Sequence, residues 1–189
     1  MDKKFRLKDK FNFSKVKILK ICAYTLCLIA SIALLAGFNF QPFAAAVNSR
    51  KIPIYCVDRS DNKVAITFDA AWGADKTQKI LDVCHRYGVK ATFFLVGFWI
   101  DNYPDMVKKI DEMGHTIGTH SETHPKMGSL SAEKITQELS SSMKKITDLT
   151  GKEVKLFRAP FGDYSNRLLE VAEGMGLSTI CLLYTSDAA

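Results

Sequence analysis

From residue 63 onward, short apolar runs alternate with longer segments in which apolar residues recur at helical spacing. The apolar runs predict strands at Val64–Phe68, Ala91–Val96, Thr116–Thr119, Val154–Phe157 and Leu177–Ile180. The helical spacing predicts helices at Lys76–Tyr87, Pro104–Met113, Ser131–Leu149 and Asn166–Met175, each followed by a glycine suited to a helix C-terminus. Asp75, with Gln78 three residues later, suggests a capping box at the first helix. Repeated strand–helix units at this spacing predict a parallel α/β fold.

The N-terminal part follows a different pattern. Residues 21–38 form an uncharged apolar run of 18 residues, which is long enough to span a bilayer as a helix. The basic segment before it, residues 1–20, is predicted to stay cytoplasmic. Ala44–Ala46 also fits a cleavage site, so a signal sequence remains the alternative to an anchor. Both interpretations place the rest outside the cell, anchored or secreted, after a linker at 39–62.

Charge and cysteine content exclude some classes of function. Eight basic and two acidic residues precede residue 47, whereas the rest of the chain carries eighteen of each. The basic excess therefore belongs to the N-terminal segment, and we expect no nucleic-acid binding by the exported part. The five cysteines include no CxxC pair, so we predict neither a disulfide framework nor a thiolate zinc site. A Cys56–Cys84 bridge after export remains open.

Polar residues follow three of the predicted strands, where parallel α/β folds place their chemistry. Asp69 ends the first strand as a candidate base or ligand, although it could also cap the following loop. In the segment HSETH, His120 and His124 can face one metal ion from a helical turn or a tight loop. His85 and His115 are interpreted as structural.

The third cluster is the segment RAPFGDY, Arg158 to Tyr164. A buried guanidinium at Arg158 needs an acidic partner, and Asp69 is the natural candidate. Pro160 and Gly162 impose an unusual loop path that could aim a backbone N–H into the site. Metal ligands, an oriented carboxylate and an oxyanion donor are what metal-assisted hydrolysis requires.

The segments TFDAAWG, HSETH and RAPFG resemble, in order, those of the polysaccharide deacetylase family (NodB-like domain, carbohydrate esterase family four). The resemblance covers about Lys63 to Ile180 and looks closest to sporulation-associated, membrane-anchored deacetylases of Gram-positive spore formers. It implies a distorted (β/α)7 barrel, of which about five strand–helix units are present. It also implies removal of N-acetyl groups from peptidoglycan or chitin-like polymers with Zn²⁺ or Co²⁺.

The resemblance assigns roles residue by residue. It implies Asp69 as catalytic base, Arg158 as the residue that orients it, and the Phe161 backbone N–H as oxyanion donor. His120 and His124 correspond to metal ligands. Candidate substrate-binding residues are Trp72, Pro160 and Tyr164.

One departure concerns the metal. The family usually has two adjacent aspartates in its first segment, base then ligand, and here the second is Ala70. We therefore expect weaker metal binding. Asp75 or Glu122 could substitute, although a helix cap and a solvated loop residue are the favoured interpretations. Two alternatives stay open: an inactive, metal-poor glycan-binding envelope protein, and an amide hydrolase for small substrates.

The other departure is at the C-terminus. The further strand, the D-x-x-D-W-like segment and the later general-acid histidine of the family do not occur in this sequence. Residues 181–189, CLLYTSDAA, resemble translated sequencing-adapter read-through and are predicted to be a non-native tail. We expect the chain as written to fold poorly and to have little activity, and a longer parent to be the functional protein. The sequence does not determine its oligomeric state.

Overall fold

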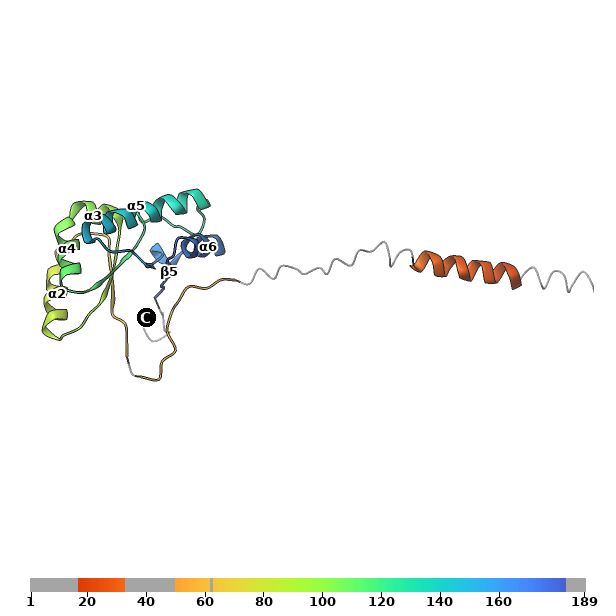
Figure 1. The fold of residues 1–189 in the computed structure, drawn as a ribbon, viewed down its shortest axis with the longest axis horizontal. Coiled ribbons are helices and arrows are strands. Elements are labelled where there is room, and N and C mark those ends of the chain that lie inside the picture. Colours follow the sequence, from red (N-terminus) through yellow and green to blue (C-terminus); the bar gives the residue numbers. More distant parts are fainter. Residues whose placement is uncertain (1–16, 33–49, 62, 183–189) are drawn as a thin grey trace, which may run out of the picture. The chain divides into compact units, whose positions relative to one another are not determined.

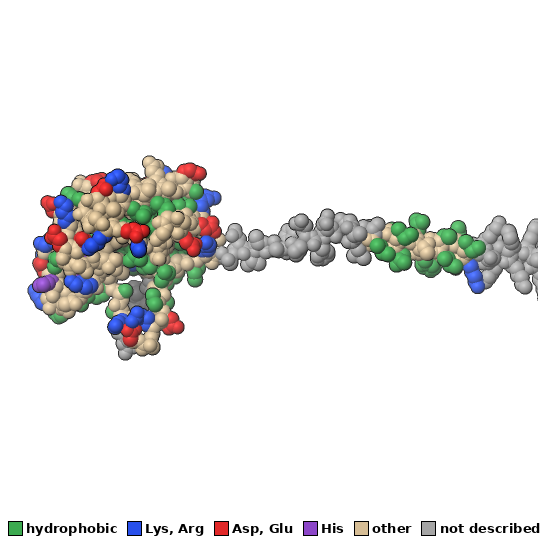
Figure 2. Space-filling model, in the orientation of Figure 1, with side chains coloured by type: hydrophobic (Ala, Val, Ile, Leu, Met, Phe, Trp, Pro, Cys, Tyr) green, Lys and Arg blue, Asp and Glu red, His purple; other side chains and the backbone are tan. Residues whose placement is uncertain are grey.

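The computed structural model describes residues 17–32, 50–61 and 63–182. The chain divides into two units, one up to Ser49 and one from Arg50 onward. In the first unit residues 17–32 form an α-helix with exposed side chains, which are mostly apolar beyond the lysines at one end (Figure 2).

The transmembrane anchor expected at residues 21–38 is not supported by the structure. Among the described residues, no helix combines the length and the apolar character needed to cross a membrane. Residues 33–38 of that range, and the candidate cleavage site Ala44–Ala46, lie outside the described residues.

The second unit is built on a parallel five-stranded sheet whose strand order follows the sequence, β1-β2-β3-β4-β5 (Figure 1). The strands are β1 Thr67–Ala70, β2 Thr92–Leu95, β3 Thr116–Thr119, β4 Leu156–Phe157 and β5 Ser178–Thr179. The parallel α/β prediction is confirmed, and closure into a (β/α)7 barrel stays a prediction. The expected bounds of the first strand were wrong, because pairing with β2 runs from Thr67 to Ala70. Asp69 therefore lies inside β1 rather than after it.

The helices connect successive strands on the path that the sequence predicted, with one addition. They are α2 Thr77–Arg86, α3 Gly97–Asn102, α4 Pro104–Glu112, α5 Ala132–Thr150 and α6 Asn166–Gly174, with a 3-10 turn η1 at Pro160–Gly162. The sequence did not predict α3, whose six residues are too few for apolar positions to recur at helical spacing over several turns. Trp99 of α3 donates its indole N–H to the Gly73 carbonyl at 2.8 Å, which ties this helix to the loop after β1.

Side-chain hydrogen bonds cap the N-termini of two helices. Ser131 accepts a hydrogen bond from the Lys134 N–H at the start of α5, and Ser165 accepts one from the Leu168 N–H at α6. The capping box expected at Asp75 was wrong. The residue that begins α2 is Lys76, which has no side-chain cap, and the Asp75 carboxylate instead pairs with the Lys76 ammonium at 2.9 Å.

Part of the segment predicted as a linker packs on the sheet. Ile54 pairs with Ile180 beyond the outer edge of β5, donating to the Thr179 carbonyl and accepting from the Cys181 N–H. Lys51 adds a backbone hydrogen bond to the Asn166 side chain. Ile54 therefore covers part of one sheet edge, which would otherwise expose unpaired backbone groups.

The close packing at Gly118 leads to a first prediction. A Cβ at this position in β3 would lie 2.7 Å from the Phe94 ring and 2.9 Å from the Leu156 carbonyl oxygen. Gly118→Ala should therefore lower the free energy of unfolding by about 1–3 kcal/mol through overpacking. Gly174→Ala is the matched control, because no atom lies within 4 Å of its Cβ, and it should be neutral or stabilising. Urea unfolding of both variants measures the change in stability. Equal unfolding midpoints for the two variants would contradict the prediction.

The buried His115 leads to a second prediction, on pH. The Ala91 backbone N–H donates to His115 Nδ1 at 3.1 Å, so this nitrogen is unprotonated. Burial, with a smaller effect of Lys90, lowers the pKa of His115 in the folded protein. The unfolded chain therefore binds a proton below about pH 6.5 that the folded chain does not, and stability falls as the pH drops below that value.

His115→Asn separates this contribution from that of other histidines. An asparagine Oδ1 can accept the same backbone hydrogen bond and does not titrate. Urea unfolding at pH 7.5 and 5.5 should show a smaller loss of stability for the variant than for the wild type. Equal losses would show that His115 does not contribute.

Candidate functional site

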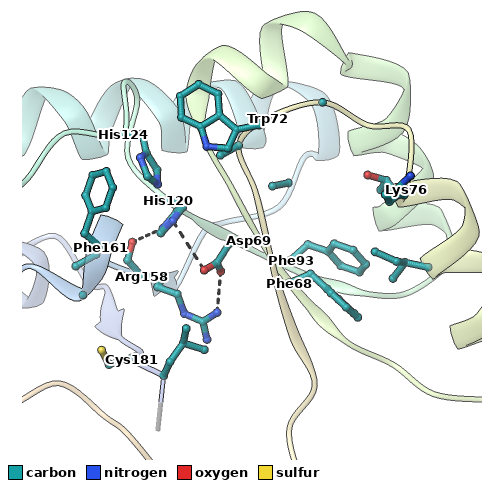
Figure 3. Close-up of a pocket in the computed structure, with 18 of the residues that line it drawn as sticks. Phe68, Asp69, Trp72, Lys76, Phe93, His120, His124, Arg158, Phe161 and Cys181 are labelled. Atoms are coloured by element: carbon teal, nitrogen blue, oxygen red, sulfur yellow. Dashed lines mark hydrogen bonds and ion pairs between the residues drawn. The ribbon is translucent and has the colours of Figure 1, made fainter. Parts of the chain in front are cut away.

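The sheet brings Asp69 of β1 and Arg158, which follows β4, into direct contact (Figure 3). Arg158 Nη1 lies 2.7 Å from Asp69 Oδ1, the pairing that the sequence predicts. The guanidinium is buried and packs over the Phe94 ring, 4.1 Å from its centroid. One oxygen of Asp69 is held in this way, and the other, Oδ2, faces His120. The carboxylate is thus oriented while the Asp69 side chain stays 31% exposed.

His120 is held from the opposite side by a backbone carbonyl. Its Nδ1–H donates to the Arg158 carbonyl oxygen at 2.8 Å, because a carbonyl can only accept. Nε2 therefore carries the lone pair and lies 3.9 Å from Asp69 Oδ2. Burial lowers the pKa of His120, against the opposing effect of Asp69. A neutral imidazole with one nitrogen anchored by a hydrogen bond is the form that binds metals.

His124 lies beside His120, as the sequence predicts. The two ring centroids are 4.9 Å apart. A tight loop rather than a helical turn achieves this, with Ser121 at φ 68° and His124 at φ 58°. Burial also lowers the pKa of His124, with Asp69 opposing. Both imidazoles are therefore directed at one region as neutral donors.

Two side chains present, His120 and His124, are suitable ligands for one divalent metal ion. Rings this close can reach one ion at Zn–N distances of about 2.0–2.1 Å. In the described part of the chain, however, no group of three or more His, Cys, Asp or Glu side chains could hold a metal ion. Ala70, whose side chain cannot bind a metal, lines the cavity next to Asp69. The protein thus offers two nitrogen donors and lacks the second aspartate of the family pattern.

Neither suggested substitute for the missing aspartate points at the histidines. The exposed Asp75 pairs with Lys76. The expectation that Glu122 is solvated was wrong, because its side chain is 19% exposed and pairs with Lys145. Its other oxygen lies against Gly97, where a Cβ would come within 2.1 Å.

A cavity of about 470 Å³ opens in front of these groups. Asp69, His120 and His124 lie on its wall, and Trp72 and Phe161 flank them as aromatic walls (Figure 3). Trp72 is 80% exposed and Phe161 is 68% exposed, both unusual for large apolar side chains. Such exposed rings beside polar groups are typical of a ligand site.

The remaining candidate residues are arranged around η1. Phe161 has φ 59°, and its N–H has no acceptor among the loop and turn hydrogen bonds of the described residues. It is therefore free to donate to a ligand. Pro160 is buried, and the Tyr164 hydroxyl bonds to the Tyr55 hydroxyl at 3.2 Å, so neither lines the cavity.

The residues that hold the histidine loop were missed by sequence reasoning. Glu138 and Ser142 of α5 bond to residues 119–123. The signal was two polar residues four positions apart on a helix face otherwise formed by Ile135, Leu139 and Ile146.

The sequence profile described as Polysaccharide deacetylase matches residues 57–180. The chain belongs to this family. An uncharacterised 30.6 kDa protein of Geobacillus stearothermophilus is 39% identical over 127 residues, which cover 67% of this chain and 48% of that protein. The peptidoglycan-N-acetylmuramic acid deacetylase PdaA of Bacillus subtilis is 32% identical, with the same coverage of both chains.

A solved structure adds a contrasting relative. The crystal structure of a family 4 carbohydrate esterase pseudoenzyme from Bacillus anthracis matches with a TM-score of 0.67 and 32% identity. The match covers 69% of this chain and 46% of that one. This chain spans about half the length of the curated relatives it matches. Relatives thus include a named deacetylase and a named pseudoenzyme.

Proposed function

We propose that the protein is a metal-dependent deacetylase that removes N-acetyl groups from an amino-sugar polymer, with peptidoglycan or a chitin-like glycan as substrate. The observation that carries this proposal is the Asp69 carboxylate, held at 2.7 Å by buried Arg158 and facing His120. A carboxylate fixed in this way, beside two neutral imidazoles, suits proton transfer from a water molecule. Family membership and the named deacetylase PdaA support the same reaction.

His120 and His124 would hold the metal, Zn²⁺ or Co²⁺. When bound, such an ion polarises the acetyl carbonyl and lowers the pKa of its water. Asp69 Oδ2 accepts the proton from the attacking water, while Arg158 keeps the carboxylate in place. The Phe161 N–H donates to the oxygen on which negative charge develops. Trp72 and Phe161 supply apolar faces against which a sugar ring can pack.

The proposed cellular location of the protein follows from its proposed polymer substrate. A cell-wall polymer lies outside the membrane, so the second unit would act extracellularly, either anchored through the N-terminal segment or secreted. The likeness to sporulation-associated members belongs to this proposal as well. Neither location nor developmental role changes the chemistry expected of Asp69.

The second candidate is a glycan-binding envelope protein without catalysis. Ala70 favours it, since the site keeps the base and lacks one oxygen ligand. The structural likeness to a named pseudoenzyme points the same way. The aromatic walls serve this function equally well.

Acetate release separates the two functions. The full-length protein would be incubated with N-acetylglucosamine oligomers and with peptidoglycan, with Zn²⁺ or Co²⁺ and with a chelator, and bound metal would be measured in parallel. A deacetylase releases acetate only in the metal-loaded samples. Glycan binding without acetate release under any of these conditions would establish the binding function instead.

A further inference from the structure

Glu138 is a buried carboxylate on the face of α5 that packs against the rest of the unit. Its side chain is 2% exposed and lies between the fully buried Ile135 and Leu139. Glutamate is almost never fully buried unless it is paired or hydrogen-bonded. Lys134 Nζ is 3.9 Å away on the same helix, and its own side chain is half exposed. The contacts that explain why Glu138 is buried therefore come from outside α5.

Those contacts all come from the loop between the two histidines. Oε2 of Glu138 accepts the backbone N–H groups of Glu122 at 3.1 Å and of Thr123 at 2.8 Å. Oε1 accepts the Thr123 hydroxyl at 2.8 Å. An ionised carboxylate only accepts hydrogen bonds, so it matches three converging donors.

The loop needs such an anchor because its backbone is unfavourable. Ser121 and His124 both have positive φ without being glycine, a conformation that persists only where the surroundings impose it. One helical turn beyond Glu138, Ser142 Oγ lies 2.5 Å from Thr119 Oγ1, which in turn accepts the Ser121 N–H. Two polar residues of α5 thus hold the start and the middle of the loop.

The two imidazoles are anchored in different ways. His120 is held directly, through Nδ1, by the Arg158 carbonyl. The His124 ring makes edge contacts with His120, Phe161 and Trp72, and no hydrogen bond from another residue to its ring is found among the described residues. Its position depends on the loop backbone, where Glu138 accepts the N–H groups of residues 122 and 123 and the Ser121 hydroxyl accepts the His124 N–H at 3.0 Å.

We propose that Glu138 is a positioning residue that sets the separation of His120 and His124 and thereby the affinity of the pair for a divalent metal. The inference rests on the proposed function only in taking these histidines as metal ligands. Glu138 acts from outside the cavity, through hydrogen bonds to the loop rather than through its charge.

Three variants test this in the full-length protein. Glu138→Ala removes the acceptor, whereas Glu138→Gln keeps an amide oxygen for the two backbone N–H groups and can donate to the Thr123 hydroxyl. Thr123→Val removes one contact of the three and serves where Glu138→Ala fails to fold. Leu139→Ala is the control, because it removes buried contacts of α5 without touching the loop.

Two readouts are measured: Co²⁺ affinity by titration, and amide exchange at Glu122 and Thr123 in metal-free protein. Glu138→Ala should weaken Co²⁺ binding about 10- to 100-fold, as loss of an outer-shell partner does, and speed exchange of both amides at least about tenfold. Thr123→Val should fall between Glu138→Ala and wild type. Glu138→Gln should stay close to wild type in both readouts, and Leu139→Ala should keep the wild-type Co²⁺ affinity.

Specific results would overturn the proposal. Unchanged Co²⁺ affinity in Glu138→Ala would do so, as would equal losses in Glu138→Ala and Glu138→Gln, or in Glu138→Ala and Leu139→Ala. A wild-type protein that binds no Co²⁺ would instead overturn the metal site of the proposed function. Amide exchange would then still decide whether Glu138 fixes the loop.

Discussion

Ala70→Asp is expected to raise the affinity of the site for Co²⁺ or Zn²⁺ at least about tenfold, which corresponds to about 1.4 kcal/mol. Ala70 ends β1 next to the base Asp69 and lines the same cavity as both histidines. An aspartate there would add an oxygen donor to two nitrogen donors, the three protein ligands typical of catalytic zinc sites. If metal occupancy limits activity, acetate release at low metal concentration should rise with affinity.

Ala71→Asp is the matched control for this substitution. Ala71 lines the same cavity one residue further along, so its aspartate adds the same charge without standing where the family places its ligand. Isothermal titration of both variants with Co²⁺ distinguishes direct ligation from a general electrostatic effect. Equal affinities for the two variants would rule out a ligand position at residue 70.

Asp69→Asn is expected to lower acetate release by about 10²- to 10⁴-fold, the usual contribution of a positioned general base. The asparagine oxygen can still accept the hydrogen bond from Arg158 Nη1, so the neighbouring side chains should keep their places. The substitution removes the group that accepts the proton from water.

Asp75→Asn provides the control for Asp69→Asn. Asp75 lines the same cavity but is exposed and pairs with Lys76, so its variant should keep activity within about twofold. Initial rates of acetate release, with thermal melting to show that both variants are folded, complete the test. A small effect of Asp69→Asn would show that another group takes the proton.

The sequence predicted much of the site because each functional group lies at the carboxyl end of a strand or just after it. Asp69, His120 and Arg158 fall on β1, just after β3 and just after β4, and a parallel sheet places these ends at one edge. The Asp69–Arg158 contact follows from this rule and from the need of a buried guanidinium for an acid. The regular spacing of strands and helices, with a glycine after each predicted helix, was enough to predict this parallel arrangement.

Other features depend on contacts between distant segments. The sequence did not indicate α3, a short helix tied to the loop after β1 by the Trp99 indole. The solvated interpretation of Glu122 failed because Lys145, 23 residues away, pairs with it. Pairing with β2 decided where β1 begins, which composition alone did not.

By itself, then, the sequence determined the order of strands and helices, the residues at the strand ends and the loss of one carboxylate at Ala70. These properties are local, since they depend on residue type and on spacing along the chain. Tertiary structure alone decided the path of the histidine loop and its support by Glu138, 14 residues beyond His124 in the sequence. The reason is physical: positive φ at Ser121 and His124 is unfavourable in isolation, and it persists where α5 supplies the acceptors that hold it.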